Sequence, residues 1–258
     1  MSTNFMKIAT NAKLAEFSYP DFYGIDLNNP IAVKNRVKEG LEIDDKFAQA
    51  FVDSYQVVAH QPNTDSGFSA TVVRDKKTNH ATVMCRGTEM TKPNDLAADA
   101  QIALGYGIPI GQTIDLRNFI ERLKTPKGAP ILEAYYDIET RALDEKNDKE
   151  KPYYEHVKFR ISHDKNFAGL GVLSSNEKIT ATGHSLGHNL CSGADRLYPE
   201  LIDSVYGYNG AGFGSEVNIK PFFDKLAQRD TQFHPEKYVD IYGQDGFRVI
   251  ANNVPFLG

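Results

Sequence analysis

The stretch that most constrains what this chain can fold into is KITATGHSLGHNL, residues 178–190. A β-branched run from Ile179 to Thr182 predicts a short buried strand. Apolar residues then resume at helical spacing between Leu186 and Leu197, which predicts a helix. A serine with a glycine two residues away on either side stands between these two elements, as Gly183-x-Ser185-x-Gly187.

This spacing has a chemical reason. A serine hydroxyl is a weak nucleophile unless it is presented, and a sharp strand-to-helix turn raises it above the sheet. The glycines leave room where strand and helix nearly touch, while the helix N-terminus supplies free N–H groups and partial positive charge. G-x-S-x-G occurs by chance in roughly one chain in ten of this length, but here a strand precedes it and a helix follows. We expect His184 to be structural, wedged beneath the turn.

Composition narrows the classes of protein to which the chain can belong. Its 258 residues suffice for one large domain, and the net charge of −5 gives no reason to expect nucleic acid. No apolar run approaches the roughly 18 residues of a membrane-spanning helix. Residues 1–20 lack the basic-then-apolar order of a signal peptide. We expect a cytoplasmic protein or one exported by a signal-independent route.

The rest of the chain alternates between predicted helices and strands. Residues 1–54 form an N-terminal helical part, and residues 101–173 form a lid or insertion region. Part of the latter, residues 101–130, is apolar and glycine-rich, which fits either a lid and acyl-chain wall or a buried connection. The predicted helices are 5–17, 44–55, 116–123, 131–143 and 219–227. The predicted strands are 55–60, 67–74, 80–85, 201–209 and 237–242.

The strand at 80–85 runs directly into Arg86-Gly87-Thr88. Acyl transfer needs two backbone N–H groups to hold the developing oxyanion, one of them from the residue after the nucleophile. Leu186 would supply the first of these groups and Thr88 the second. The alternative is an ordinary turn at the end of a strand.

Taken in order, Arg86-Gly87-Thr88, Asp95-Leu96-x-x-Asp99, Gly183-His184-Ser185-Leu186-Gly187 and the stretch 205–213 resemble a class 3 lipase. The resemblance covers roughly residues 55–250. It implies an α/β-hydrolase fold, with a mostly parallel central sheet, helices on both faces, and a single domain over 1–258. It also implies a serine hydrolase of lipid esters, a triacylglycerol lipase or a phospholipase A1, and is compatible with substrate at a membrane or lipid-droplet surface. In the family, the region of Asp95 and Asp99 braces the oxyanion loop.

Such chemistry needs neither a cofactor nor a metal ion. The sequence has no D-x-D-x-D-G calcium loop and no glycine-rich nonapeptide repeat. Cys85 and Cys191 match neither a metal-site spacing nor a disulfide framework. Because each lies in a predicted core element, we expect two buried free thiols.

The acid and the base of a triad are harder to place. In the chain order serine, acid, histidine, Asp245 follows the strand at 237–242 and is the expected acid, with Asp240 or a plain turn as alternatives. No histidine follows Asp245. The expected base therefore lies beyond residue 258, in a C-terminally incomplete domain; His234 is a weaker candidate, and we expect His188 to pack locally. The other hypothesis is a hydrolase-like module without catalysis, which binds lipid or another protein.

Overall fold

The computed structural model describes residues 2–87, 107–139, 141 and 152–243. Within these residues the helices are α1 (Ser2–Glu16), α2 (Pro30–Leu41), α3 (Asp45–Ser54), α5 (Ile110–Lys124), α7 (Leu186–Leu197) and α8 (Glu216–Ala227). The strands are β1 (Tyr55–Gln61), β2 (Ala70–Asp75), β3 (Ala81–Cys85), β4 (Ile131–Tyr136), β5 (Val157–Ser162), β6 (Ile179–His184), β7 (Ile202–Tyr208) and β8 (Tyr238–Ile241). Short 3₁₀ turns lie at Tyr153–His156, Lys165–Phe167 and Pro235–Lys237.

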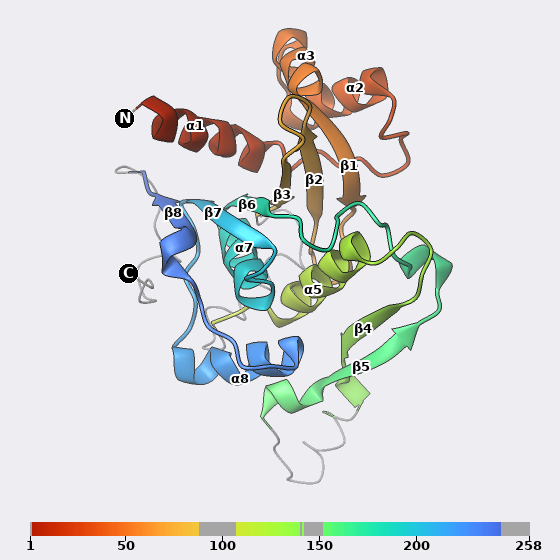
Figure 1. The fold of residues 1–258 in the computed structure, drawn as a ribbon, viewed down its shortest axis with the longest axis vertical. Helices are drawn as coiled ribbons and strands as arrows, with labels where there is room; N and C mark the ends of the chain where they lie inside the picture. The colour runs from red at the N-terminus through yellow and green to blue at the C-terminus, as the bar shows by residue number, and fades with distance from the viewer. Residues whose placement is uncertain (1, 88–106, 140, 142–151, 244–258) are drawn as a thin grey trace.

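The described residues form a central sheet with the strand order β1-β2-β3-β6-β7-β8 (Figure 1). The first three strands are an antiparallel meander. From β3 onward every neighbouring pair is parallel. The meander contributes the edge strand β1, and the parallel half brings the carboxyl ends of β3, β6, β7 and β8 to one edge of the sheet. Parallel α/β sheets bind ligands at that edge.

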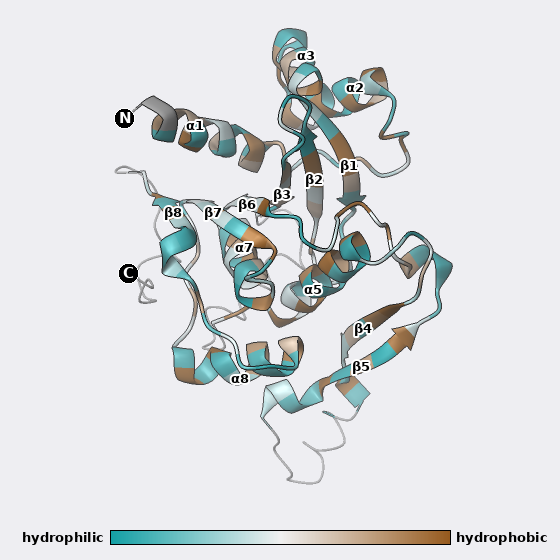
Figure 2. Cartoon of the chain, in the orientation of Figure 1, coloured by the Kyte–Doolittle hydropathy of each residue, from teal (hydrophilic) through white to brown (hydrophobic). Residues whose placement is uncertain are grey.

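Helices cover both faces of this sheet, which confirms the predicted α/β architecture. Side chains alternate between faces along each strand, so Val72 joins the core under α5, α7 and α8, while Val73 joins the core under α1, α2 and α3. Hydrophobic and hydrophilic residues accordingly alternate along α5 and α7 (Figure 2). The parallel strand β6 is buried at every position up to Gly183, as a strand covered on both faces must be.

Most elements predicted from the sequence are present, but residues 131–136 are a strand and not the start of a helix. β4 pairs antiparallel with β5 in a separate ribbon beside α5 (Figure 1). Only Ile131 and Ala134 of β4 are buried, and this spacing of three imitates a helix face. The Asn118 side chain of α5 donates to the Ala134 carbonyl (2.8 Å) and accepts from its N–H (2.9 Å). These two bonds hold the ribbon against the helix.

The predicted connection ahead of α5 is only partly described. Ile108 and Ile110 are buried in the core, and residues 110–124 form α5. Residues 101–106 lie outside the described part. A role of residues 101–173 as a lid or insertion stays a prediction. No helix in the described part of the chain is long and apolar enough to cross a bilayer.

Candidate active site

Ser185 sits in a strained backbone conformation between β6 and α7. Its φ is 54° and its ψ is −123°, a region in which L-residues are rarely found because of their Cβ atom. Its own N–H and carbonyl groups are both hydrogen-bonded. The Ser185 N–H donates to the Tyr208 carbonyl (3.0 Å), and the Ser185 carbonyl accepts from the N–H groups of His188 and Ala211 (both 3.1 Å). The surrounding structure therefore holds a conformation that the residue would not adopt alone.

The glycines of the motif stand where three backbones converge. A Cβ added to Gly183 would lie 2.4 Å from the Gly187 carbonyl carbon, so only glycine lets α7 leave β6 this sharply. A Cβ on Gly187 would lie 2.3 Å from the Cys85 carbonyl oxygen, and one on Gly87 would lie 2.5 Å from the His184 carbonyl oxygen. The end of β3 thus reaches the turn that carries Ser185.

This convergence bears on the predicted oxyanion site. Leu186 is the first residue of α7, and the first N–H groups of a helix have no acceptor within it. Gly87, the residue before Thr88, touches the turn beside Ser185. Thr88 itself, with Asp95 and Asp99, lies outside the described residues. The structure brings the Arg86-Gly87 segment and the serine motif together.

Arg86 fixes the strand end from which that segment leaves. Its side chain is buried and donates to the Asn63 side chain and to the Gly67 carbonyl (3.2 Å), while its N–H donates to the Ser69 carbonyl (3.0 Å). A buried, always charged guanidinium keeps its partners in place because leaving them unpaired would be costly. The first residue of the R-G-T tripeptide therefore holds the end of β3 in place.

The segment that leads to the expected acid, Asp245, is described as far as Gly243. Asn209, at the end of β7, donates its N–H to the Ile241 carbonyl (2.8 Å) and accepts from the Gly243 N–H at its side-chain oxygen (2.8 Å). Asn209 has a φ of 47°, the left-handed region that asparagine tolerates better than most residues. The chain thus leaves β8 at the same sheet edge as Ser185, two residues before Asp245, which lies outside the described residues.

His188 pairs with Asp240 rather than with Ser185. Its Nε2 lies 2.9 Å from Asp240 Oδ1 and 3.2 Å from Ser192 Oγ. Both partners use the same ring nitrogen, so this cluster cannot relay a proton from a serine to a carboxylate through the two nitrogens, as a triad does. The Nδ1 atom is buried and has no hydrogen-bond partner among the described residues. His188 is therefore engaged away from Ser185, as expected, but its ion-pair partner is the distant Asp240 and not only a local neighbour.

The sequence held one signal for this packing. A Cβ on Gly210 would lie 1.8 Å from His188 Nδ1, and one on Gly207 would lie 2.4 Å from His188 Cδ2. The imidazole occupies the space that two missing side chains leave at the end of β7. These glycines explain why a large side chain can occupy the first turn of α7.

His234 is also engaged elsewhere. Its Nδ1 lies 3.1 Å from Asp195 Oδ2, and Lys237 and Tyr238 donate to the same fully buried carboxylate (2.8 and 2.9 Å). Asp195 is ten residues along α7 from Ser185, which is about 15 Å at the helical rise. The structure therefore does not bring His234 to Ser185. None of the described residues forms a hydrogen bond with Ser185 Oγ.

The remaining titratable groups near the turn are structural. Burial lowers the pKa of the His184 imidazole, and the Glu16 carboxylate partly opposes this effect. Cys85 and Cys191 are free and buried, as expected, and burial raises the pKa of the Cys191 thiol. No group of three or more His, Cys, Asp or Glu residues in the described ranges could hold a metal ion.

Comparisons with known proteins give only distant structural similarities. No protein-family model matches the sequence, and no curated protein matches it. Among solved structures, the chain is similar to the Lip2 lipase from Yarrowia lipolytica, with 13% identity and a TM-score of 0.41 over 94% of this chain and 71% of the lipase. It is also similar to lipase II from Rhizopus niveus, with 13% identity and a TM-score of 0.34 over 86% and 69%. Both scores are too low to support an argument, so function must be argued from the geometry above.

Proposed function

We propose that this chain is a serine carboxylic-ester hydrolase that acts on lipid esters, a triacylglycerol lipase or a phospholipase A1, through an acyl-enzyme on Ser185. The observation that carries the proposal is the backbone of Ser185, with its φ of 54°, between the parallel strand β6, which is buried up to Gly183, and the helix α7. Strain of this kind persists where the surrounding structure imposes it, and it clusters at catalytic sites.

The proposed chemistry uses the groups that converge on this turn. Ser185 Oγ attacks the ester carbonyl carbon and gives its proton to a histidine; the leaving alcohol takes that proton. The N–H groups of Leu186 and Thr88 hold the oxyanion, with Gly183 and Gly187 shaping the turn. Water then cleaves the acyl-enzyme. Asp245 orients this histidine.

The rival proposal is a hydrolase-like module that binds lipid or a protein partner without turnover. The pairing of His234 with Asp195 favours it, because this candidate base is engaged away from Ser185. Added imidazole separates the two, because a free base can stand in for an absent side chain. A serine that is presented for attack then gains reactivity, and a serine that is merely strained does not.

The test is labelling of the 258-residue chain with a fluorophosphonate, with and without added imidazole, followed by mass spectrometry of the modified peptide. We expect labelling at Ser185 that imidazole accelerates and that Ser185→Ala abolishes. The matched control is Ser175→Ala, which removes an exposed serine and should label like the wild type. No labelling in the presence of imidazole, with a folded chain, would refute the proposed nucleophile and leave the binding module.

A further inference from the structure

The strand β8 precedes the expected acid, Asp245, but little of this strand is buried. It has four residues, and none of them is buried. In the described sheet it is the last strand in the order, paired in parallel with β7. Strand register is strongly specified where one face is buried and weakly specified elsewhere. Polar contacts are therefore needed to hold β8 in register.

The helix α7 supplies such contacts from two positions on one face. His188 and Asp195 are seven residues apart, which is about two helical turns, so their side chains project from the same side. The buried Asp195 carboxylate accepts from the Tyr238 hydroxyl at the start of β8 (2.9 Å). His188 Nε2 lies 2.9 Å from Asp240 Oδ1, two residues farther along the strand. Both contacts attach the same strand to the same helix.

His188 reaches β8 by passing over a glycine of β7, the strand beside it. Gly207 is the register partner of Asp240, and a Cβ on Gly207 would lie 2.4 Å from His188 Cδ2. A larger residue at this position would therefore collide with the imidazole. A slip of β8 by one residue would move Asp240 by about 3.3 Å and turn its side chain to the other face. The pair is thus compatible with one register of β8.

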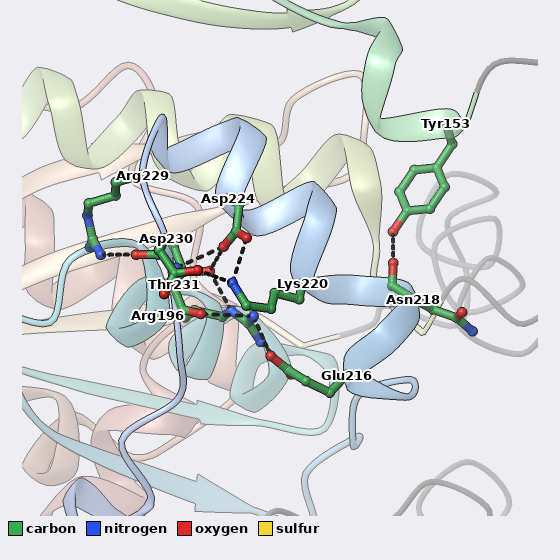
Figure 3. A network of polar contacts seen from close by, with 9 residues as sticks. All are labelled: Tyr153, Arg196, Glu216, Asn218, Lys220, Asp224, Arg229, Asp230 and Thr231. Carbon is green, nitrogen blue, oxygen red and sulfur yellow. Dashed lines mark hydrogen bonds and ion pairs between the residues drawn. The ribbon is translucent and has the colours of Figure 1, made fainter.

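α7 provides a fixed reference for this attachment, because its far end is held by a separate network. The Arg196 side chain is fully buried and forms a two-pronged ion pair with Glu216 at the start of α8 (2.7 and 2.8 Å). Its Nε donates to Thr231 Oγ1 (2.9 Å), and that hydroxyl donates to Asp224 (2.7 Å), as Figure 3 shows. These contacts join α7 to α8 and to the loop that follows it. β8 is therefore attached to a helix that other contacts hold in place.

The residue that contacts β8 also belongs to the turn that carries Ser185. The His188 N–H donates to the Ser185 carbonyl (3.1 Å) in the first turn of α7. At the other end of the pair, Asp240 stands one residue before Ile241, whose carbonyl accepts from the Asn209 N–H (2.8 Å). The pair therefore connects the serine turn with the segment that leaves β8.

We propose that His188 and Asp240 are positioning residues for hydrolysis, and that their pair sets the place of the end of β8 relative to Ser185. The inference rests on the proposed function for the reaction that it serves, while the attachment of β8 does not. Neither side chain exchanges a proton with the substrate in this role. What the role requires is an acceptor at the position of Asp240 Oδ1. Asparagine can supply that acceptor, and alanine cannot.

The first test is amide hydrogen exchange of the full chain, followed by NMR. Asp240→Ala should accelerate exchange of the Asn209 and Gly243 N–H groups by about 10- to 100-fold, as expected for loss of a hydrogen bond to a charged group. Asp240→Asn should show a small part of this effect. Ser192→Ala is the matched control, because it removes the other neighbour of His188 Nε2 (3.2 Å) and leaves the pair with Asp240. The amides of β3 should exchange at the same rate in every variant.

The second test is the rate of fluorophosphonate labelling at Ser185, with added imidazole, in the same variants. Asp240→Ala should slow labelling by up to about 100-fold, because a misplacement of about 1 Å at a reacting group can have this effect. Asp240→Asn should restore most of the rate, and Ser192→Ala should label like the wild type. The Asp240 side chain is 29% exposed, so these variants should fold, and circular dichroism checks this at the assay temperature. Asp240→Val takes the place of Asp240→Ala if the latter is unfolded.

The two tests separate this inference from the proposed function. Faster exchange in Asp240→Ala, with no labelling of the wild type, would support the attachment of β8 and refute the proposed function. Labelling of the wild type and of Asp240→Ala at equal rates would overturn the positioning role, as would unchanged exchange at Asn209 and Gly243. If Asp240→Asn slows labelling as strongly as Asp240→Ala, the carboxylate itself is required and the positioning role is wrong.

Discussion

The strain at Ser185 can be measured by removing its side chain in two ways. Ser185→Ala and Ser185→Gly both delete the hydroxyl, and they differ only in the Cβ atom that makes the φ of 54° and ψ of −123° unfavourable. Backbone conformations of this kind cost about 1–3 kcal/mol for an L-residue. Glycine avoids this cost but loses about 0.4–1 kcal/mol through the greater entropy of its unfolded chain. We therefore expect Ser185→Gly to be more stable than Ser185→Ala by about 1 kcal/mol.

The assay is thermal unfolding of both variants. For a domain of this size, about 1 kcal/mol corresponds to a rise in Tm of about 2–4 °C. The same Ala-to-Gly comparison on an ordinary helix supplies the control. Ala50 is an exposed residue within α3, where Ala50→Gly should destabilise the chain by about 1 kcal/mol. The sign of the effect is thus opposite at the two positions.

One result would refute the reasoning. If Ser185→Gly is less stable than Ser185→Ala by the amount seen at Ala50, the backbone at Ser185 is not strained in solution. The turn would then be an ordinary helix start, and the observation that carries the proposed function would be lost. Failure of fluorophosphonate labelling alone would not have this meaning, because strain can persist without a base.

Three further predictions concern the surroundings of the site. Gly210→Ala places a Cβ 1.8 Å from His188 Nδ1, so the free energy of unfolding measured in urea should fall by about 1–3 kcal/mol. Adding His188→Ala to the same chain should restore most of this loss, and a loss that is not restored would contradict the contact. Arg196→Ala should lower the free energy of unfolding by about 3 kcal/mol or more in the same assay, whereas Glu216→Gln should lower it by about 1 kcal/mol. The difference is expected because the arginine is fully buried and the glutamate is half exposed. Equal losses would count against a central role of Arg196. Asp115, in α5, accepts hydrogen bonds from the hydroxyls of Thr64 (2.7 Å) and Ser66 (2.6 Å). Burial raises the pKa of this carboxyl above its usual value, and the two hydrogen bonds partly oppose the effect. The folded state therefore holds the proton more tightly than the unfolded chain, and the associated stability is present at low pH and lost as the pH rises. Asp115→Asn should therefore reduce the decline in unfolding free energy on going from acid to neutral pH, and an unchanged pH profile would contradict it.

The elements of the sheet could be predicted because their patterns are local. The strand at 179–182 and the helix after it follow from periodicity and from the glycines between them, and the structure confirms both. Residues 131–136 were mistaken for a helix because burial every third residue in a two-stranded ribbon matches a helix face. The helix α2 was not predicted, although Asn29 caps it and Pro30 begins it, a recognised start signal.

The site was less accessible to sequence reasoning, because its contacts are made between distant segments. Ser185 and Leu186 belong to one motif and could be named. The pairing of His188 with Asp240 joins residues 52 positions apart, and only the glycines at 207 and 210 hinted at the space that it fills. The assignments of Thr88 and Asp245 remain predictions, since both lie outside the described residues.

The position of α1 affects the order in which parts of the protein can fold during synthesis. This first helix packs on β6 and β7, where the Ile8 carbonyl accepts from the Tyr208 hydroxyl (2.5 Å) and the Asn11 carbonyl accepts from Thr182 Oγ1 (3.0 Å). These partners follow 200 and 171 residues later, so at about 5–20 residues per second α1 waits roughly ten to forty seconds for its binding surface. The turn at Ser185 follows β6, so a change in α1 acts directly on the strand that carries this turn.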